Sequence, residues 1–225
     1  MSSTHEPPAK QLPIDGLASG RDPNYIDSVF DLTEEKVEKL KNVKPKLLGI
    51  RCRRADCEKG LHCFDGVKLK PKFAPGKCQQ CGVDLVNWDE VWLRDLRDVE
   101  KKFAFFEKEW IRHFFFHVPI TDRVSKYARK HGLEGLGDIL EKQLRSKKML
   151  KYIRALDSTQ THMLNGTIVH WARHAVGCCC RRCLTYWHNI PFDHELTDED
   201  IAYFRALVLK FISKRMPDLS LKPSS

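Results

Sequence analysis

Cysteine and histidine are the residues of this sequence whose spacing offers the clearest chemistry. Nine Cys and ten His occur among 225 residues. Cys52 and Cys57 are separated by four residues, Cys78 and Cys81 by two, and twenty residues lie between the pairs. Two tight turns that each supply two thiolates suit the tetrahedral coordination of zinc. We therefore predict a structural Zn²⁺ site at these four cysteines, with every position filled and no catalysis.

The segment around these pairs leaves the exact ligand set open. His62 and Cys63 also lie between the pairs, and one of them could replace Cys57. Gly82 follows Cys81, where such a turn commonly needs a positive φ. The alternative is four reduced cysteines without an ion. We favour zinc, because a segment of about 40 residues without an apolar core needs a bound metal or another cross-link to fold.

A second group of potential ligands lies in the stretch HWARHAVGCCCRRCLTYWH, residues 170–188. Arg181 and Arg182 stand beside its thiols and would favour the thiolate form that binds metals. An iron–sulfur cluster, a reactive thiol, or small side chains that merely allow close helix packing are the alternatives. We predict a second, mixed Cys/His zinc site, drawn from His174, Cys179, Cys180, Cys183 and His188.

His113 and His117 are four residues apart and project from one face of a predicted helix. They fall on its apolar seam. Either they are core histidines held by hydrogen bonds, or they chelate a metal together with a second helix. The sequence leaves this pair as a possible further metal or polar site.

The second cysteine group carries a resemblance to a known family. The carrying stretches are QTHMLNG at 160–166, HAVGCCCRRCLTYWHNIP at 174–191, and ELTDEDIAY at 195–203. They resemble the bacterial family catalogued as domain of unknown function 4186, over residues 122–212. The resemblance implies a fold and a ligand-like cluster, without an assigned activity. Thr167 stands where the family has His, and Arg173 where it has Gln. The matching positions are His174, Ala175, Cys179, Cys180, Arg181, Cys183, Leu184, Trp187 and His188.

Positive charge indicates the class of partner. Lys and Arg number 39 against 30 Asp and Glu, a net charge of +9. The stretch RSKKMLKYIR, residues 145–154, contains five basic residues and no acid. Such clustering is typical of proteins that bind nucleic acid or another polyanion, although a solvated helix face is the plain alternative. The predicted nucleic-acid contacts are Lys147, Lys148, Lys151 and Arg154 on one helix face, with Arg181 and Arg182.

The periodicity of apolar residues predicts the elements that position these groups. From Trp92 to His117 apolar or aromatic residues recur at steps of four and three, which predicts one long helix. Further helices are expected from Asp122 to a terminator at Gly132, over 138–156, over 168–187, and after a capping box that begins at Thr197. We predict an α+β fold that is mostly α, with a small zinc-ribbon-like module before a helical domain.

The expected organisation is a flexible tail at 1–24, a short helix and the ribbon at 25–88, and the long helix at 89–120. The family-like helical domain follows at 121–215, and a tail at 216–225. No apolar run approaches the ~18 residues of a membrane span, and the N-terminus lacks a signal pattern. We expect a soluble cytoplasmic protein, where thiols stay reduced.

Common catalytic motifs are missing from the sequence. It has no phosphate-cradling glycine loop, nucleophile elbow or paired-carboxylate motif. We therefore favour a non-catalytic, zinc-stabilised basic protein that binds nucleic acid or a nucleic-acid-processing protein complex. The alternative is a metalloenzyme that acts on nucleic acid or nucleotides through the second Cys/His site.

Overall fold

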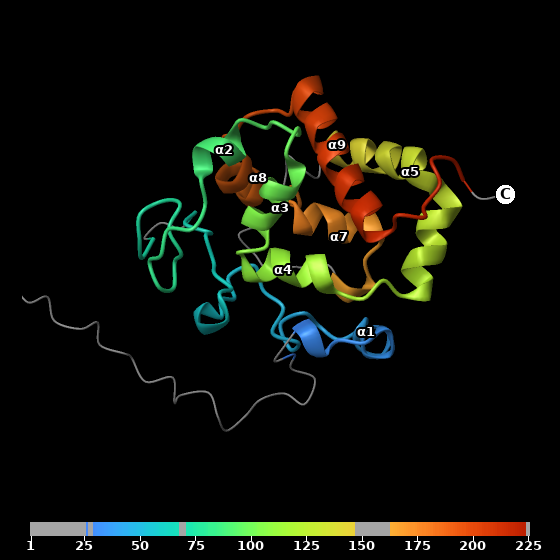
Figure 1. Ribbon diagram of the computed structural model, residues 1–225, viewed down its shortest axis with the longest axis horizontal. Coiled ribbons are helices and arrows are strands. Elements are labelled where there is room, and N and C mark those ends of the chain that lie inside the picture. The colour runs from blue at the N-terminus through green and yellow to red at the C-terminus, as the bar shows by residue number, and fades with distance from the viewer. Residues whose placement is uncertain (1–25, 27–28, 68–70, 147–162, 224–225) are drawn as a thin grey trace, which may run out of the picture.

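The computed structural model describes residues 26, 29–67, 71–146 and 163–223. Figure 1 shows a helical body with an irregular N-terminal module beside it. The fold is mostly helical, as predicted, and in the described residues the N-terminal module carries only two isolated β-bridges, Asp56 with Leu61 and His62 with Glu109. The helices are α1 (Glu34–Leu40), α2 (Trp88–Trp92), α3 (Val99–Phe106), α4 (Trp110–His117), α5 (Asp122–Leu144), α7 (Ile168–Ala175), α8 (Arg181–His188) and α9 (Asp198–Arg215), with 3-10 turns η1 (Val29–Asp31), η2 (Cys57–Lys59) and η3 (Met163–Asn165).

The core lies where α4, α5 and α9 surround α7. Helix α7 buries Trp171 completely, and its indole N–H donates to the Met163 carbonyl at 2.8 Å. Helix α9 begins with the predicted capping box, in which Thr197 and Asp200 each satisfy the other's backbone N–H. Its apolar stripe is buried at every position, namely Ile201, Phe204, Val208, Phe211 and Ile212.

The prediction of one long helix over 89–120 is wrong. The chain forms α2, α3 and α4 instead, with breaks before Val99 and after Phe106. At the second break the His62 N–H donates to the Lys108 carbonyl at 2.8 Å, and the Trp110 N–H donates to the His62 carbonyl at 2.9 Å. The backbone of His62 thus forms hydrogen bonds with the Lys108 carbonyl and the Trp110 N–H, two groups that a continuous helix would pair internally.

The helix expected over 168–187 is also divided, into α7 and α8. Gly177 lies between them with φ +73°, and a Cβ there would meet the Trp187 ring at 3.0 Å. Only glycine satisfies both the backbone angle and the close ring. The break places Cys178, Cys179 and Cys180 in a connecting turn rather than on a helix face.

As predicted, the helix that begins at Asp122 ends at Gly132, whose backbone is non-helical with φ 64° and ψ 172°, and α5 joins two helices across this kink. The C-terminal segment docks at this kink, since Leu133 and Glu134 donate backbone hydrogen bonds to the carbonyls of Ser220 and Leu221, both at 3.0 Å. Met216 and Leu219 are buried. Residues 216–222, expected to be a tail, are therefore part of the packed structure. No helix among the described residues is long and apolar enough to cross a membrane.

We expect Gly132→Ala to destabilise the protein by about 1–3 kcal/mol, because it combines a positive φ with a steric clash. A Cβ at Gly132 would lie 2.5 Å from the backbone carbon of Lys222. Gly135→Ala is the matched control in the same helix, since only the His131 Cβ lies near, at 3.4 Å. Denaturant unfolding measures both variants. Equal stability of the two would contradict the role of the kink.

Candidate metal centres

The first metal centre comprises Cys57, His62, Cys78 and Cys81, whose ligand atoms all lie within 4.8 Å of one another. The Sγ atoms of Cys57 and Cys78 are 3.9 Å apart, and Cys81 Sγ is 3.5 Å from His62 Nδ1. Tetrahedral zinc, with bonds of about 2.3 Å to sulfur and 2.0–2.1 Å to nitrogen, places two sulfurs about 3.8 Å apart and sulfur and nitrogen about 3.6 Å apart. The four residues therefore fit Zn²⁺.

Local backbone geometry aims these ligands at a common point. Gly82 adopts φ +80°, as predicted, and its N–H donates to the Cys78 carbonyl at 2.8 Å. The Gln80 N–H points at Cys78 Sγ, 3.4 Å away, which favours a thiolate there. On the other limb, η2 ends at Gly60 in the left-handed region. Two glycine-permitted turns thus bring both halves of the centre together.

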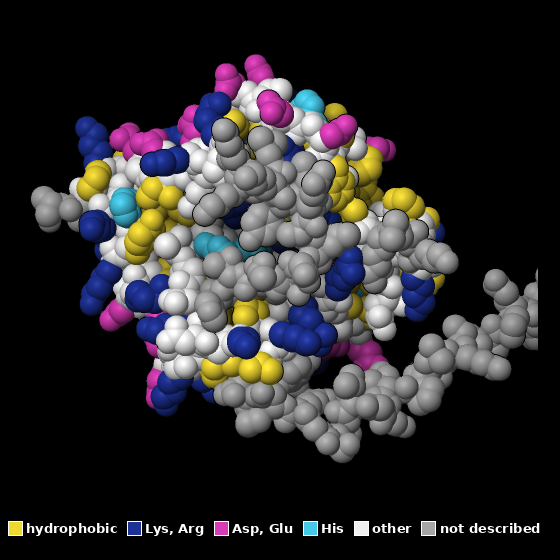
Figure 2. All heavy atoms as spheres, turned by 180° about the vertical axis from the view of Figure 1, so that it is seen from behind, with side chains coloured by type: hydrophobic (Ala, Val, Ile, Leu, Met, Phe, Trp, Pro, Cys, Tyr) yellow, Lys and Arg dark blue, Asp and Glu magenta, His cyan; other side chains and the backbone are white. Residues whose placement is uncertain are grey.

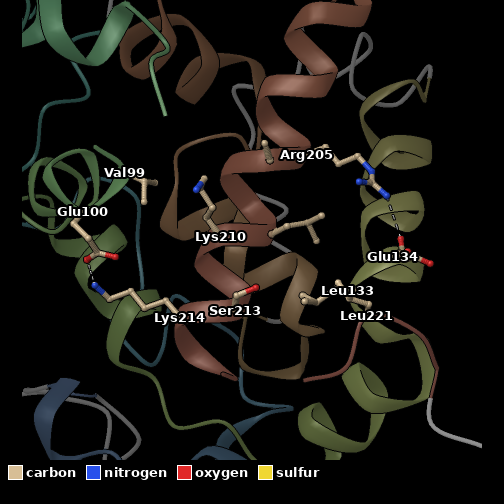
Figure 3. Close-up of a pocket in the computed structure, with 11 residues that line it drawn as sticks. Val99, Glu100, Leu133, Glu134, Arg205, Lys210, Ser213, Lys214 and Leu221 are labelled. Atoms are coloured by element: carbon tan, nitrogen blue, oxygen red, sulfur yellow. Dashed lines mark hydrogen bonds and ion pairs between the residues drawn. The ribbon is translucent and has the colours of Figure 1, made fainter. Parts of the chain in front are cut away.

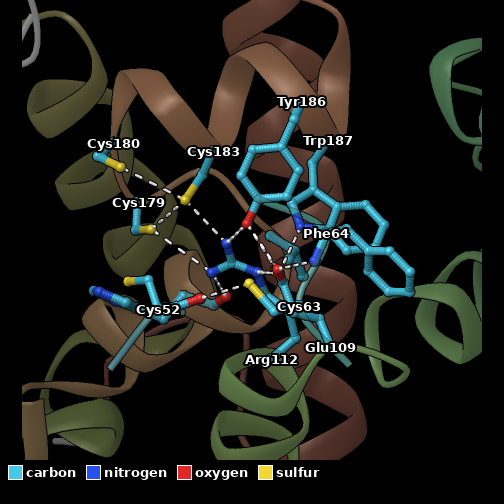
Figure 4. A network of polar contacts seen from close by, with 12 residues as sticks. Cys52, Cys63, Phe64, Glu109, Arg112, Cys179, Cys180, Cys183, Tyr186 and Trp187 are labelled. Carbon is cyan, nitrogen blue, oxygen red and sulfur yellow. Dashed lines mark hydrogen bonds and ion pairs between the residues drawn. The ribbon is translucent and has the colours of Figure 1, made fainter. Parts of the chain in front are cut away.

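The structure corrects one predicted ligand, because His62 takes the fourth place and Cys52 lies elsewhere. The backbone pairing of His62 with the break between α3 and α4 holds its imidazole at the centre. Burial lowers the pKa of His62, which keeps it in the neutral form that binds a metal. Burial raises the pKa of Cys52, and the neighbouring Cys183 and Cys179 raise it further. Figure 4 shows Cys52 beneath Cys179, at the other centre.

The second centre brings together Cys179, Cys180 and Cys183. Their Sγ atoms lie 3.4 Å (Cys179 to Cys183) and 3.5 Å (Cys180 to Cys183) apart. Cys180 is the N-cap of α8, and Cys183 lies in the first turn of that helix. The three thiols converge only because the chain breaks between α7 and α8. Their separation suits thiolates that share one ion.

A buried arginine supports this second centre (Figure 4). Arg112 is fully buried, and its guanidinium donates to Cys183 Sγ at 2.9 Å and to the Tyr186 hydroxyl at 3.0 Å. Hydrogen bonds from the neighbouring thiols, with Arg112 nearby, hold the pKa of Cys179 well below its usual range. The thiolate is the form that ligates metals. Cys179 is thereby favoured as a thiolate, while hydrogen bonds with Cys179 raise the pKa values of Cys180 and Cys183.

Glu109 balances the charge of Arg112 and is also fully buried. Its carboxylate accepts from Arg112 Nε at 3.1 Å, from the Trp187 indole at 2.9 Å, from the Tyr186 hydroxyl at 3.0 Å, and from the Phe64 N–H at 3.2 Å. Burial raises the pKa of Glu109 to about 7, opposed by Arg112, Trp187 and Tyr186. No motif in the sequence marks this pair, although two charges three residues apart within an apolar seam signal it.

Neither histidine predicted for the second centre belongs to its ligand group. His174 Nδ1 hydrogen-bonds the His170 carbonyl at 2.9 Å, and its ring packs on Phe115. His188 Nε2 donates to the Val176 carbonyl at 2.9 Å and is fully buried. The His188 ring thereby holds the backbone just before the cysteines of the connecting turn. His113 and His117 do lie together, with their ring centroids 4.1 Å apart.

The predicted phosphate contacts are placed unequally. Arg181 is only 1% exposed, so its guanidinium does not face solvent as expected. Arg182 is partly buried and pairs with Asp65 at 3.2 Å. The other four predicted contacts lie outside the described residues, namely Lys147, Lys148, Lys151 and Arg154.

A cavity of about 690 Å³ lies between α3, α5 and α9, away from both centres (Figure 3). Among its charged groups, Lys214 pairs with Glu100, and Arg205 with Asp138. No residue predicted for a site lines this cavity. This cavity therefore contributes no residue to either cysteine centre.

Comparison with known proteins finds one family. A family model described as a domain of unknown function (DUF4186) matches residues 100–213. No solved structure matches the chain. The matched span contains Arg112, Glu109 and the second centre, whereas the first centre lies outside it.

The ligand sets predict different outcomes for two cysteines. We expect Cys81→Ser to lose one zinc equivalent and to unfold the N-terminal module, because metal binding supplies its folding energy. Cys52→Ser should keep the first centre filled. Elemental analysis with proteolysis of the module measures both. If Cys81→Ser keeps its full zinc content, or if Cys52→Ser makes the module sensitive to proteolysis, the ligand set is wrong.

His188 predicts a pH dependence. Burial lowers the pKa of His188 to about 3, so between about pH 6.5 and 3 this histidine is protonated in the unfolded chain and neutral in the folded chain. This histidine's contribution is present above about pH 6.5 and is lost as pH falls toward 3, by up to about 1.4 kcal/mol per unit. His188→Gln should keep all bound metal and show a shallower loss of stability below pH 6.5. Unfolding titrations at several pH values compare it with the wild type, and an unchanged slope would contradict this role.

Proposed function

Because the chain belongs to the DUF4186 family, whose description names no activity, we propose its function from the centres themselves: a zinc-stabilised, basic protein that binds nucleic acid. The observation that carries this proposal is the first centre, which offers four protein ligands within 4.8 Å on an irregular module. A centre filled by protein ligands supports structure rather than catalysis. The module then presents its loops as a binding surface.

Exposed cations lie on the module that contains this first centre. Arg51, Lys59 and Lys77 are exposed. Lys72 is exposed as well, and its ammonium donates to the Gln80 carbonyl at 3.0 Å, beside Cys81. Fixed cations on a metal-stiffened loop suit phosphate contacts, which provide most of non-specific nucleic-acid affinity.

Not every basic side chain of the module is available. Arg53 and Arg182 both pair with the buried carboxylate of Asp65. Arg54 covers the Trp110 ring at 4.3 Å and donates to the Ile26 carbonyl. These arginines join the module to the helical body. On the face shown in Figure 2, Lys and Arg are spread widely, while Asp and Glu gather mainly toward its upper edge.

The sequence contributes a second part of the proposed surface. Four of the five cations of the RSKKMLKYIR stretch, Lys147, Lys148, Lys151 and Arg154, add concentrated charge to a chain of net charge +9. If they neutralise about four phosphates of duplex DNA, the log–log slope of affinity against salt is about −4. We propose that both cation groups act together.

Fluorescence anisotropy with labelled single- and double-stranded DNA and RNA, over a salt series, tests the proposal. We expect tighter binding at low salt and a slope reduced by about one for each phosphate-binding lysine removed. The variants are Lys72→Glu with Lys77→Glu, and the fourfold change of Lys147, Lys148, Lys151 and Arg154 to Glu. The matched control is Lys126→Glu with Lys130→Glu, two exposed lysines of α5 that carry the same charge change.

Two results would overturn the proposal. One is salt-independent or undetectable binding by the zinc-loaded wild type. The other is a control variant that weakens binding as much as the Lys72 and Lys77 variant, because that would show an effect of net charge alone.

A further inference from the structure

A carboxylate meets two histidines at the junction of α3 and α4. His113 and His117 lie one turn apart on α4, and Glu107 is the C-cap of α3. Glu107 Oε2 is 2.9 Å from His117 Nε2, and one ligand atom of each residue lies within 4.8 Å of the others. We propose that these three residues form a third metal site, for a divalent first-row transition ion bound through nitrogen and oxygen.

Only the tertiary structure creates this arrangement. In a continuous helix, residues ten positions apart are separated by about 15 Å along the axis. The break beside Lys108, held by the backbone of His62, turns Glu107 back onto His117. A carboxylate and two imidazoles thereby present one oxygen and two nitrogens at a single point.

His113 provides the second, independent observation. Its Nε2 is buried and has no hydrogen-bond partner among the described residues. A simple ion pair between His117 and Glu107 leaves this atom unexplained, whereas a shared ion satisfies it. Phe30, although 63% exposed, packs edge-on against the His113 ring at 5.1 Å, and its ring lies tilted 5.9 Å from the His117 ring. This aromatic cover limits solvent on one side of the site.

The donor set distinguishes this site from the cysteine centres. Two imidazoles and one carboxylate leave coordination positions open and suit ions such as Fe²⁺, Mn²⁺, Co²⁺, Ni²⁺ or Zn²⁺. The side chains of His117 and Glu107 are 40% and 29% exposed, so an ion can enter from solvent. We expect an exchangeable ion here, in contrast to zinc enclosed by thiolates. The inference is independent of nucleic-acid binding.

Titration with Co²⁺ of the full-length protein, loaded with only the two zinc equivalents of the cysteine centres, tests the site by calorimetry and visible absorption together. We expect one Co²⁺ to bind with weak absorption and no sulfur-to-cobalt charge-transfer band, because no thiolate contributes. His117→Ala and Glu107→Gln should each weaken this binding at least about tenfold, as loss of a ligand does. The zinc content should stay unchanged in both variants.

His131→Ala is the matched control, since His131 also lies on a helix and packs on an aromatic ring, that of Tyr127. It should bind Co²⁺ like the wild type. Thermal unfolding shows whether each variant is folded, and His117 is the safer of the two histidines to change because it is the more exposed. The proposal fails if His117→Ala binds Co²⁺ with wild-type affinity, if the control loses binding equally, if the spectrum shows charge-transfer bands, or if the wild type binds no additional ion.

Discussion

The structure depends on one backbone contact, the pairing of His62 with the break between α3 and α4. Its two hydrogen bonds, to Lys108 and from Trp110, replace pairs that a continuous helix would make itself. They place the His62 imidazole among three thiols and turn Glu107 toward His117. Because of these bonds a new helix, α4, begins after its N-cap Glu109, whose side chain is buried in the core. The position of His62 between α3 and α4 thus affects the geometry of all three candidate centres.

The charges beneath the second centre explain why a cation suits it. Arg112 and Glu109 are both fully buried, and a buried pair is tolerated only when further hydrogen bonds satisfy its remaining donors and acceptors. Tyr186, Trp187 and the Phe64 N–H satisfy Glu109, while Cys183 and Tyr186 satisfy Arg112. Since Glu109 already neutralises Arg112, additional thiolates in this low-dielectric region require another positive charge. A divalent ion would supply it.

The N-terminal module is joined to the family domain by specific contacts. The Asp65 carboxylate, 1% exposed, holds both Arg53 of the module and Arg182 of α8. The ring of Phe64 packs edge-on against Trp187 at 6.0 Å, and the backbone of Phe64 donates to Glu109. The module therefore contacts the residues that support the second centre. A change of metal content at the first centre would loosen this support.

The sequence by itself determined the mostly helical class, the turn at Cys78 and Cys81 with Gly82, and the capping box at Thr197, because each depends on neighbours within a few residues. It also located the cysteines of the second centre. The tertiary structure alone decided that His62 rather than Cys52 completes the first centre, and that the seam from Trp92 to His117 is broken. Helical periodicity indicates which residues share a face. It does not indicate whether the backbone of a distant segment forms the hydrogen bonds that would otherwise continue the helix. Ligand spacing likewise counts residues between cysteines, whereas coordination requires their sulfur atoms to meet in space.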